Sequence, residues 1–301
     1  MNPFRKFTLG ILKKFKFLPA PVYMKFYYEY YTGKKLNLED PQEFNEKIQW
    51  LKVYYHPPIL SKLVDKYAVR EYVKEKLGPG YLNELYAVYD NEEDVDFDKL
   101  PDQFVLKAAH GYNFNLIVKD KEELNLFQAR LKFKKWMNRN QYYRGGLEWA
   151  YKNTPPRIIA EKYLPEIEKN DASDFKFYCF NGKPRYVEIT VQVDGVDLRC
   201  NYDLQWKKAP FYRKAIPYFE GEAARPETFE EMKEVATKLA ANFPFVRVDL
   251  YDINAKIIFG EMTFYPADGR YPYLPDEYNK IIGDYMALPE IPAGKNEITG
   301  I

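Results

Sequence analysis

Residues 245–264 carry charged side chains at positions where they could bind a metal ion and a phosphate group. The segment reads Phe-Val-Arg-Val-Asp-Leu-Tyr-Asp-Ile-Asn-Ala-Lys-Ile-Ile-Phe-Gly-Glu-Met-Thr-Phe. β-Branched and aromatic residues fill both halves, and a polar bend lies near Asn254, so the segment is predicted to form two strands joined by a short loop. If the loop has three residues, 254–256, Ile253 faces Ile257.

In that register Asp249 lies opposite Glu261, and Arg247 lies opposite Thr263. Opposite residues of an antiparallel ladder share a face, with Cβ atoms about 5 Å apart. Two facing carboxylates repel each other; a divalent cation between them would relieve this, and the neighbouring guanidinium suits phosphate. A slip of one residue would place Asp249 opposite Gly260 and turn Glu261 to the other face, leaving a solvated hairpin with unrelated charges.

A second hairpin is predicted over residues 174–193. The pair Asn181–Gly182 is the preferred sequence for a two-residue type I′ turn. In the register that this turn implies, Lys176 faces Val187 and shares its face of the sheet with Asp174.

The composition argues against several kinds of chemistry. The chain has 301 residues, with 45 basic and 44 acidic side chains and a net charge of +1, so no general affinity for nucleic acid is expected. It has only two cysteines and two histidines, without CxxC or HExxH patterns, which argues against a zinc site. Chemistry must then rest mainly on carboxylates, Lys, Arg and backbone amides. Cys179 lies in an apolar run and is predicted to be a buried thiol, and so few cysteines suit a reducing cytoplasm.

The elements that must position these residues can be predicted from periodicity. Helices are expected over most of residues 1–78, including one continuous helix over 61–77 that ends before Gly78. Further predicted elements are helices at 41–51, 124–138 and 228–242, and strands at 81–89, 104–109, 116–118 and 157–164. The predicted organisation is a helical N-terminal region at 1–90, a small lobe at 91–164, a core lobe at 165–286 and an extended tail at 287–301.

The first sixteen residues form a basic segment with regularly spaced apolar side chains. They include five Lys or Arg and no acid, and Phe4, Phe7, Ile11 and Phe15 recur at helical spacing. Lysines interrupt every apolar run, so neither a signal peptide nor a membrane span is expected. Two interpretations remain: a helix that lies on an anionic membrane surface, or a helix packed on the domain with a basic outer face.

Taken in order, these elements resemble the ATP-grasp fold. The closest resemblance is to its TupA-like branch, the teichuronopeptide-biosynthesis proteins of bacterial surface-polysaccharide loci. The segments that carry it are Phe44-Asn-Glu-Lys-Ile-Gln-Trp-Leu-Lys52, Asp65-Lys-Tyr-Ala-Val-Arg-Glu-Tyr-Val73, Leu106-Lys107 with His110-Gly111, Ile159-Ala-Glu-Lys162, Asp174-Phe-Lys-Phe-Tyr-Cys-Phe-Asn-Gly182, Val246-Arg-Val-Asp-Leu-Tyr251 and Gly260-Glu-Met-Thr-Phe264.

The resemblance implies an α+β fold with two α+β lobes that hold ATP between them, after a mainly helical N-terminal region. It implies ATP and Mg²⁺ as cofactors, phosphorylation of a carboxylate, and attack of an amine on the acyl phosphate to form an amide. The residues that it implies are Lys107 for ATP phosphate; Lys176 and Arg247 as catalytic residues that hold phosphate or acyl phosphate; His110, Gly111 and Asn113 in the phosphate loop; Glu161, Lys162 and Tyr163 near adenine; Asp174 near ribose; and Asp249, Glu261 and Thr263 for Mg²⁺.

The sequence departs from the family pattern in two places. The branch has a loop of the form His-Gly-Ser-Gly-aromatic-Asn, whereas residues 110–115 read His-Gly-Tyr-Asn-Phe-Asn. Tyr112 therefore replaces a serine, and Asn113 replaces a glycine, although Asn tolerates left-handed geometry better than other residues with a side chain. Thr263 stands where many ATP-grasp enzymes have Asn.

The sequence therefore predicts a cytoplasmic Mg²⁺- and ATP-dependent carboxylate–amine ligase. Its expected partners are an amine and a small-molecule or glycan carboxylate, plausibly a uronic acid or amino acid of a bacterial surface polysaccharide. Two other functions remain open. One is a non-catalytic nucleotide-binding partner of a polysaccharide assembly complex, which the altered loop motivates, and the other is a metal-dependent glycosyltransferase.

Overall fold

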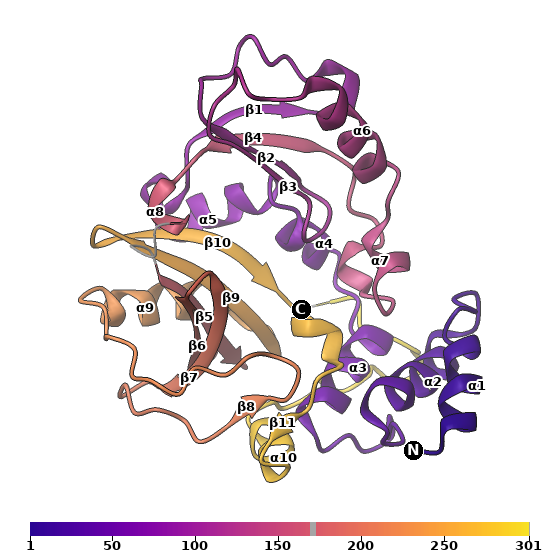
Figure 1. Ribbon diagram of the computed structural model, residues 1–301. Coiled ribbons are helices and arrows are strands. Elements are labelled where there is room, and N and C mark those ends of the chain that lie inside the picture. Colours follow the sequence, from indigo (N-terminus) through magenta and orange to yellow (C-terminus); the bar gives the residue numbers. More distant parts are fainter. Residues whose placement is uncertain (169–172, 301) are drawn as a thin grey trace.

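The computed structural model describes residues 1–168 and 173–300. Two lobes face each other across a cleft, and a helical N-terminal region packs beside the larger lobe (Figure 1). Each lobe combines an antiparallel sheet with helices, so the two-lobed α+β arrangement expected from the sequence is confirmed.

The N-terminal region is helical, as predicted, but its second half is divided differently. The predicted continuous helix over 61–77 is wrong, because one helix ends at Val64 and the next begins only at Val69. Asp65 lies in the turn between them, where its Oδ1 accepts the backbone N–H groups of Tyr67 at 2.8 Å and Ala68 at 3.1 Å. The helices are α1 (Pro3–Leu12), α2 (Ala20–Thr32), α3 (Phe44–Tyr54), α4 (Ile59–Val64) and α5 (Val69–Leu77), followed by the short η1 (Pro79–Tyr81).

The small lobe is a four-stranded sheet covered by one long helix. Its strands are β1 (Leu85–Tyr89), β2 (Phe104–Ala108), β3 (Asn115–Val118) and β4 (Ile158–Lys162), in the order β1-β4-β2-β3. Helix α6 (Leu126–Met137) buries Ala129, Phe133 and Trp136, whose spacing places them on one face. The short elements η2 (Glu92–Asp94), α7 (Gln141–Arg144), η3 (Trp149–Tyr151) and α8 (Pro165–Glu168) connect the strands and the lobes.

The large lobe is a five-stranded sheet in the order β10-β9-β5-β6-β7. Its strands are β5 (Ser173–Phe180), β6 (Lys183–Val193), β7 (Val196–Asp203), β9 (Phe245–Ile253) and β10 (Lys256–Thr263), and α9 (Phe229–Ala240) packs on one face. The remaining elements are β8 (Tyr212–Arg213), η4 (Pro266–Gly269), β11 (Tyr273–Leu274) and α10 (Glu277–Asp284). Strand β7 was not predicted, although Asp194–Gly195 before it is a strong hairpin signal.

The turn of the β9–β10 hairpin is one residue shorter than predicted. Ile253 pairs with Lys256 rather than Ile257, so the loop consists of Asn254 and Ala255 alone. Both loop residues have positive φ angles, of 53° and 59°, as a type I′ turn requires.

A β-bulge at Gly260 then corrects the register of this hairpin. The ladder shifts between Phe259 and Glu261, so that Glu261 still pairs with Asp249. A Cβ at Gly260 would lie 3.0 Å from the Tyr251 ring and 3.1 Å from the Asp249 carbonyl oxygen, which explains the glycine at this position. The predicted pairing of the carboxylates is thus confirmed, but through two compensating departures from the predicted geometry.

The β5–β6 hairpin has the predicted turn and a different register. Phe180 pairs with Lys183 across the two-residue turn, as expected. The register then shifts between Tyr178 and Cys179, so Lys176 pairs with Glu188 and the prediction of Val187 was wrong. Cys179 is buried, as predicted.

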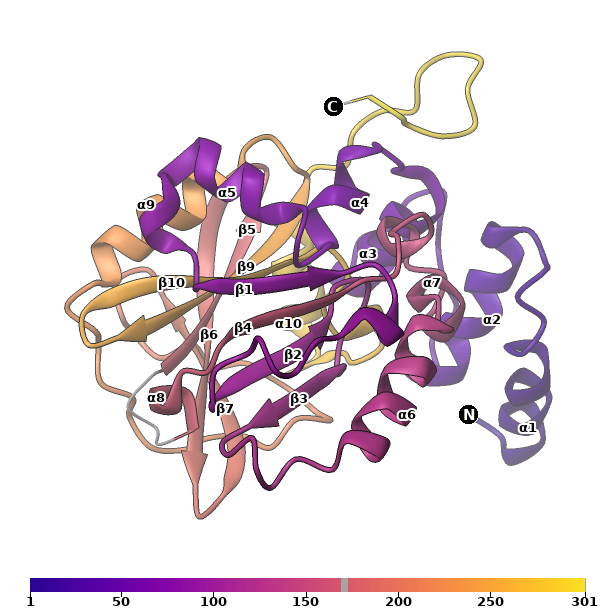
Figure 2. The same cartoon turned by 90° about the horizontal axis from the view of Figure 1, so that it is seen from above.

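Two hydrophobic cores correspond to the two lobes. One joins the large sheet, α9 and the N-terminal helices, and the other lies between the small-lobe sheet and α6. Figure 2 shows α6 against the small-lobe sheet and the pair α1–α2 at the edge of the molecule. Residues 287–300 form neither helix nor strand and include a turn in which Lys295 N–H donates to the Pro292 carbonyl oxygen at 2.9 Å. Ile298 exchanges backbone hydrogen bonds of 2.7 Å with Tyr54 and His56.

Helix α1 packs on α2, in line with the second interpretation of the N-terminal segment, but its outer side is not simply basic. Leu9 is buried, whereas Phe4, Phe7 and Ile11 are exposed. Among the described residues, no helix is long and apolar enough to cross a membrane.

Candidate functional site

A cavity of about 560 Å³ lies between the lobes and gathers most of the predicted site residues. It is bounded by strands of both sheets and by the segment between α4 and α5. The predicted residues that line it are Lys107, Asn113, Glu161, Asp174, Lys176, Arg247, Asp249, Glu261 and Thr263. His110, Gly111, Lys162 and Tyr163 do not line it.

Arg247 bridges the two facing carboxylates. Its guanidinium donates to both carboxylate oxygens of Asp249, at 2.7 and 2.6 Å, and to Glu261 Oε1 at 3.3 Å. Its Nη2 also lies 3.1 Å from Thr263 Oγ1, which in turn donates to Glu261 at 3.1 Å. The four side chains therefore form one connected polar group on the hairpin β9–β10.

Burial and neighbouring cations have opposite effects on the pKa values of the two carboxyl groups, Asp249 and Glu261. Burial raises the pKa of Asp249, against the attraction of Arg247. Burial would also raise the pKa of Glu261, but Lys66 and Arg247 outweigh it and lower that pKa to about 2. Glu261 is therefore ionised near neutral pH.

Lys176 lies beside this group on the adjacent strand β5, directly opposite Asp249. Its ammonium contacts the Asp174 carboxylate and lies 3.4 Å from Thr190 Oγ1. Burial lowers the pKa of Lys176 to about 8, although Asp249 works against this. Part of the Lys176 population is therefore neutral near neutral pH, and an arriving anion would favour the charged form.

On the opposite wall, Glu161 holds two cations in place. Lys107 Nζ donates to Glu161 Oε2 at 2.8 Å, and Arg70 donates to Oε1 at 3.1 Å. Arg70 also donates to the Asn83 carbonyl oxygen at 2.7 Å, and Asn83 donates to the Lys162 carbonyl oxygen at 2.9 Å. The end of β4 is thereby fixed to the helical region.

In the loop after β2, Asn113 stands where the family pattern has a glycine, and its backbone is in the left-handed region that glycine favours. Asn113 has a φ of 60° and lines the cavity. Gly111 is buried, and a Cβ there would lie 2.9 Å from the Phe114 ring. His110 is buried beneath the loop, where its Nε2 lies 3.0 Å from the Trp136 carbonyl oxygen and burial lowers its pKa. The position of His110 fits a role in shaping the loop.

The two remaining predicted residues lie at the end of strand β4. Lys162 is exposed, with its Nζ 3.9 Å from Glu84. Tyr163 is partly exposed and follows directly. Glu161 before them and Leu164 after them line the cavity, whereas the Lys162 backbone is hydrogen-bonded to Glu84 and Asn83.

Lys66 is a site residue that was not predicted as one. Its Nζ donates to the Gly111 carbonyl oxygen at 2.8 Å and lies 3.5 Å from Glu261 Oε2. It therefore connects the loop of the small lobe to a carboxylate of the large lobe. The break between α4 and α5 at Asp65 aims it at the cavity, and the Asp-Lys pair inside an apparently helical run was the available signal.

A second polar cluster lines the same cavity around Glu148. This carboxyl is 2% exposed, and Gln141 Nε2 donates to it at 3.2 Å. Burial, followed by the charge of Asp268, raises the pKa of Glu148 to about 8. Tyr112, the bulky residue of the altered loop, lines the same cavity as Glu148. Burial, followed by the charges of Glu148 and Asp268, raises the pKa of Tyr112 to about 12.

The donor set on the hairpin fits a hard divalent cation. Asp249, Glu261 and Thr263 offer two carboxylates and a hydroxyl at one place in the ladder, and oxygen ligands of this kind suit Mg²⁺. Among the residues that the structure describes, no three His, Cys, Asp or Glu side chains gather as a metal cluster. Mg²⁺ commonly takes only one or two carboxylates and completes its shell with phosphates and waters, so the pair is sufficient.

Comparison with known proteins gives a family and a set of similar folds. A model of the TupA-like ATP-grasp family matches residues 46–287. Comparison with curated protein sequences finds no match. Solved structures that are similar include D-alanine–D-alanine ligase from Bacillus anthracis, with 17% identity, coverage of 78% of this chain and 71% of that chain, and a TM-score of 0.46.

Two further similar structures come from other organisms. Phosphoribosylamine–glycine ligase from Thermotoga maritima has 12% identity, with coverage of 70% of this chain and 50% of that chain and a TM-score of 0.43. D-Alanine–D-alanine ligase from Helicobacter pylori has 15% identity, with coverage of 75% and 61% and a TM-score of 0.39.

The family match includes both lobes and the whole cation and carboxylate group from Lys66 to Thr263. The connected group on the hairpin, the cations of both lobes and the cavity between them are all inside it. The chain therefore belongs to the TupA-like ATP-grasp family of ligases.

Proposed function

We propose that this protein is a Mg²⁺- and ATP-dependent ligase that joins a carboxylate to an amine through an acyl phosphate. The observation that carries the proposal is the group of Arg247, Asp249 and Glu261 on one hairpin, with Lys176 opposite Asp249 on the next strand. Cations for a phosphoryl group and paired oxygen ligands for a metal lie together in one cavity, as phosphoryl transfer requires.

In the first step, a carboxylate oxygen of the substrate attacks the γ-phosphorus of ATP. The bond from that phosphorus to the β-phosphate oxygen breaks, and ADP leaves. Lys107 from the small lobe, with Lys176 and Arg247 from the large lobe, supplies positive charge around the phosphoryl group. The three cations are held by Glu161, Asp174 and Asp249 respectively, so they are already oriented before ATP arrives.

Asp249, Glu261 and Thr263 are the residues proposed to hold Mg²⁺. The bound ion supplies charge neutralisation to the phosphate oxygens. Arg247 spans both carboxylates and reduces their mutual repulsion, which keeps the two ligands in position. Lys66 adds a further cation at the outer oxygen of Glu261.

The nucleoside is proposed to lie toward the end of β4. Glu161 and Leu164 line the cavity there, beside the position that the family resemblance gives to adenine. Asp174 also lines the cavity, and its carboxylate can accept a hydrogen bond from a ribose hydroxyl. Asn113 belongs to the loop over the phosphates, whereas His110 and Gly111 shape that loop from below.

In the second step, the amine nitrogen attacks the acyl carbon, the carbon–nitrogen bond forms and phosphate leaves. The nitrogen must lose a proton in this step. Glu148 lines the cavity and has a pKa of about 8, so its carboxylate is suited to accept a proton near neutral pH. We propose that the amine enters beside Glu148 and Tyr112.

We propose further that the carboxylate belongs to a uronic acid or amino acid of a bacterial cell-surface polysaccharide, and that the reaction takes place in the cytoplasm. The family resemblance supports this, and so does the aromatic lining of the cavity, because tyrosine combines an apolar ring with a hydroxyl that can bond to sugar hydroxyls. The lining tyrosines are Tyr112, Tyr151, Tyr178, Tyr251, Tyr265 and Tyr271.

The deciding experiment is calorimetric titration of ATP with and without Mg²⁺, on the wild type and on Asp249→Asn and Glu261→Gln. We expect Mg²⁺-dependent binding that is lost in both variants while circular dichroism and thermal unfolding show intact folding. A panel of uronic acids, amino acids and amines would then be scored by ADP release. Wild-type affinity in both variants would refute the metal assignment.

The same titrations distinguish the two other functions. ATP binding without ADP release under any acceptor mixture would indicate a non-catalytic nucleotide-binding partner. The positive φ of Asn113, which preserves the turn, argues against that outcome. Displacement of ATP by nucleotide sugars, with no dependence on Lys107 and Lys176, would instead favour a glycosyltransferase.

A further inference from the structure

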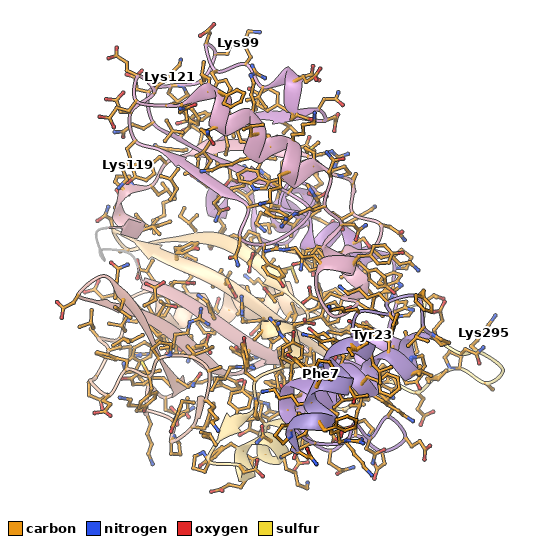
Figure 3. The ribbon with its side chains drawn as sticks, turned by 45° about the vertical axis from the view of Figure 1, so that its right-hand side comes forward. Phe7, Tyr23, Lys99, Lys119, Lys121 and Lys295 are labelled. Carbon is orange, nitrogen blue, oxygen red and sulfur yellow. The ribbon has the colours of Figure 1, made fainter. Side chains whose placement is uncertain are left out.

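Helix α1 has its apolar residues on the side that faces away from the protein. Phe4 is 76% exposed, Phe7 is 67% exposed and Ile11 is 43% exposed, whereas Leu9 is buried. Positions 4, 7 and 11 share one face of a helix, and position 9 lies on the opposite face. Figures 1 and 2 both show α1 outside α2 at the edge of the molecule, and Figure 3 shows Phe7 on this helical pair.

Two more exposed phenylalanines follow the end of the helix. Phe15 is 39% exposed and Phe17 is 81% exposed, and their rings contact each other edge to face with centroids 5.6 Å apart. We call Phe4, Phe7, Ile11, Phe15 and Phe17 the α1 patch. Four exposed phenylalanines within the first 17 residues are unusual for a globular domain and mark a surface that another body covers.

Polar contacts fix the orientation of the segment. The Arg5 guanidinium pairs with Glu29 of α2. Lys13 lies 3.9 Å from the centroid of the Tyr30 ring and donates to the Tyr31 hydroxyl at 3.2 Å. Lys16 donates to the Gly145 carbonyl oxygen at 3.2 Å. The helix is therefore attached through its basic side chains and not through its phenylalanines.

The charge of the segment identifies what covers the patch. Residues 1–17 contain Arg5, Lys6, Lys13, Lys14 and Lys16 and no acidic residue, although the whole chain has a net charge of only +1. Lys6 and Lys14 are exposed beside the patch. Aromatic side chains with adjacent lysines match the interface of an anionic bilayer, where rings enter the headgroup region and lysines meet lipid phosphate.

We propose that the α1 patch docks this protein on the surface of an anionic lipid bilayer. The proposal goes beyond the ligase function, since it needs neither ATP nor a substrate. It places an enzyme for surface polysaccharide at the membrane, but the docking surface is separate from the cavity: no residue of the patch lines it.

The test is co-sedimentation of the full chain with vesicles, without nucleotide. One preparation is a mixture of phosphatidylcholine and phosphatidylglycerol, and the other is phosphatidylcholine alone. We expect the wild type to bind the anionic vesicles, to bind the neutral vesicles far more weakly, and to lose binding as salt rises. The double variant Phe4→Glu/Phe7→Glu should bind anionic vesicles at least roughly tenfold more weakly.

The matched control is the double variant Val193→Glu/Val196→Glu, which adds the same two negative charges at exposed apolar residues beside the β6–β7 turn, 39% and 51% exposed. It should bind vesicles like the wild type, and all variants should keep the wild-type thermal unfolding. Failure of the wild type to bind anionic vesicles, or equal binding by Phe4→Glu/Phe7→Glu, would overturn the proposal. A wild-type dimer that Phe4→Glu/Phe7→Glu dissociates, without vesicle binding, would assign the patch to self-association instead.

Discussion

Lys66 Nζ lies 3.5 Å from Glu261 Oε2, so a cation from the helical N-terminal region reaches one of the two facing carboxylates of the large lobe. The same ammonium donates to the Gly111 carbonyl oxygen of the small lobe at 2.8 Å. One side chain thereby touches all three parts of the protein at the cavity. The helical region therefore contributes a side chain directly to the cavity.

Replacement of Lys66 by Met should weaken Mg²⁺-dependent ATP binding about tenfold, which corresponds to about 1.4 kcal/mol. The change removes a cation near the proposed phosphate position and leaves Glu261 with one cation fewer, so the pKa of Glu261 should rise. Isothermal titration measures the affinity. Lys62→Met, an exposed lysine of the neighbouring helix α4, is the matched control and should bind ATP normally. Equal affinities in the two variants would show that Lys66 is structural.

ATP affinity should fall as pH rises above about 8. The pKa of Lys176 is about 8 in the free protein because of burial, and bound phosphate must raise it. The charged form then binds better, so affinity is constant below the free pKa and decreases by up to about tenfold per pH unit between the free and the bound values. Titrations on either side of this pH measure the effect.

The control for this pH dependence is Lys176→Arg, since a guanidinium stays charged throughout the range. This variant should bind ATP with little change across the same window. Glu148→Gln should retain the wild-type dependence, which separates Lys176 from the other group with a pKa of about 8. A steep decline in Lys176→Arg would assign the titration to another group.

Gly260→Ala should reduce ATP binding more than its cost in stability would suggest. The added Cβ would meet the Tyr251 ring at 3.0 Å and the backbone oxygen of Asp249 at 3.1 Å, which strains the bulge that pairs Asp249 with Glu261. We expect a loss of about 1–3 kcal/mol in the free energy of unfolding and a clear loss of Mg²⁺-dependent affinity.

Denaturant unfolding and calorimetry give these two quantities. Gly80→Ala is the control, because a Cβ at Gly80 has no atom within 4 Å and its φ is not positive. It should leave both quantities unchanged. Normal ATP binding in Gly260→Ala would mean that the carboxylate pairing does not depend on the bulge.

Glu148 should make the protein less stable as pH rises. Its pKa is 4.5 in the unfolded reference and about 8 when folded, so the folded state binds the extra proton between these values. The free energy of unfolding should therefore decrease from about pH 5 to pH 8, with a slope of up to about 1.4 kcal/mol per pH unit.

The variant Glu148→Gln should lack this slope, because the amide does not titrate. Denaturant titrations of both proteins over the range measure the difference between them, which cancels the other titrating groups. The same variant should bind ATP normally but lose amide formation, since Glu148 is the proposed proton acceptor for the amine. If the free energies of unfolding of the two proteins changed with pH in the same way, the raised pKa of Glu148 would be contradicted.

The sequence alone predicted which side chains of the β9–β10 hairpin would lie together. Arg247 and Asp249 lie two residues apart on one strand, as do Glu261 and Thr263 on the other, so each pair shares a face of its strand. The predicted pairing of Asp249 with Glu261 is confirmed, although the bulge at Gly260 is needed to bring the two faces into register. The quoted sequence segments carried the family resemblance, and the resemblance implied the α+β fold. The apolar run around Cys179 predicted its burial.

Tertiary structure decided the details that depend on contacts distant in sequence. The bulge at Gly260 and the register shift beside Cys179 arise where each hairpin must pair with its neighbouring strands. The sequence around these two residues does not determine how far the pairing shifts. The role of Lys66 depends on a helix break at Asp65 and on the approach of two lobes. The outward direction of Phe4 and Phe7 depends on which face of α1 the ion pair with Glu29 selects. Helical spacing places these side chains on one face, but only packing against the rest of the chain determines where that face points.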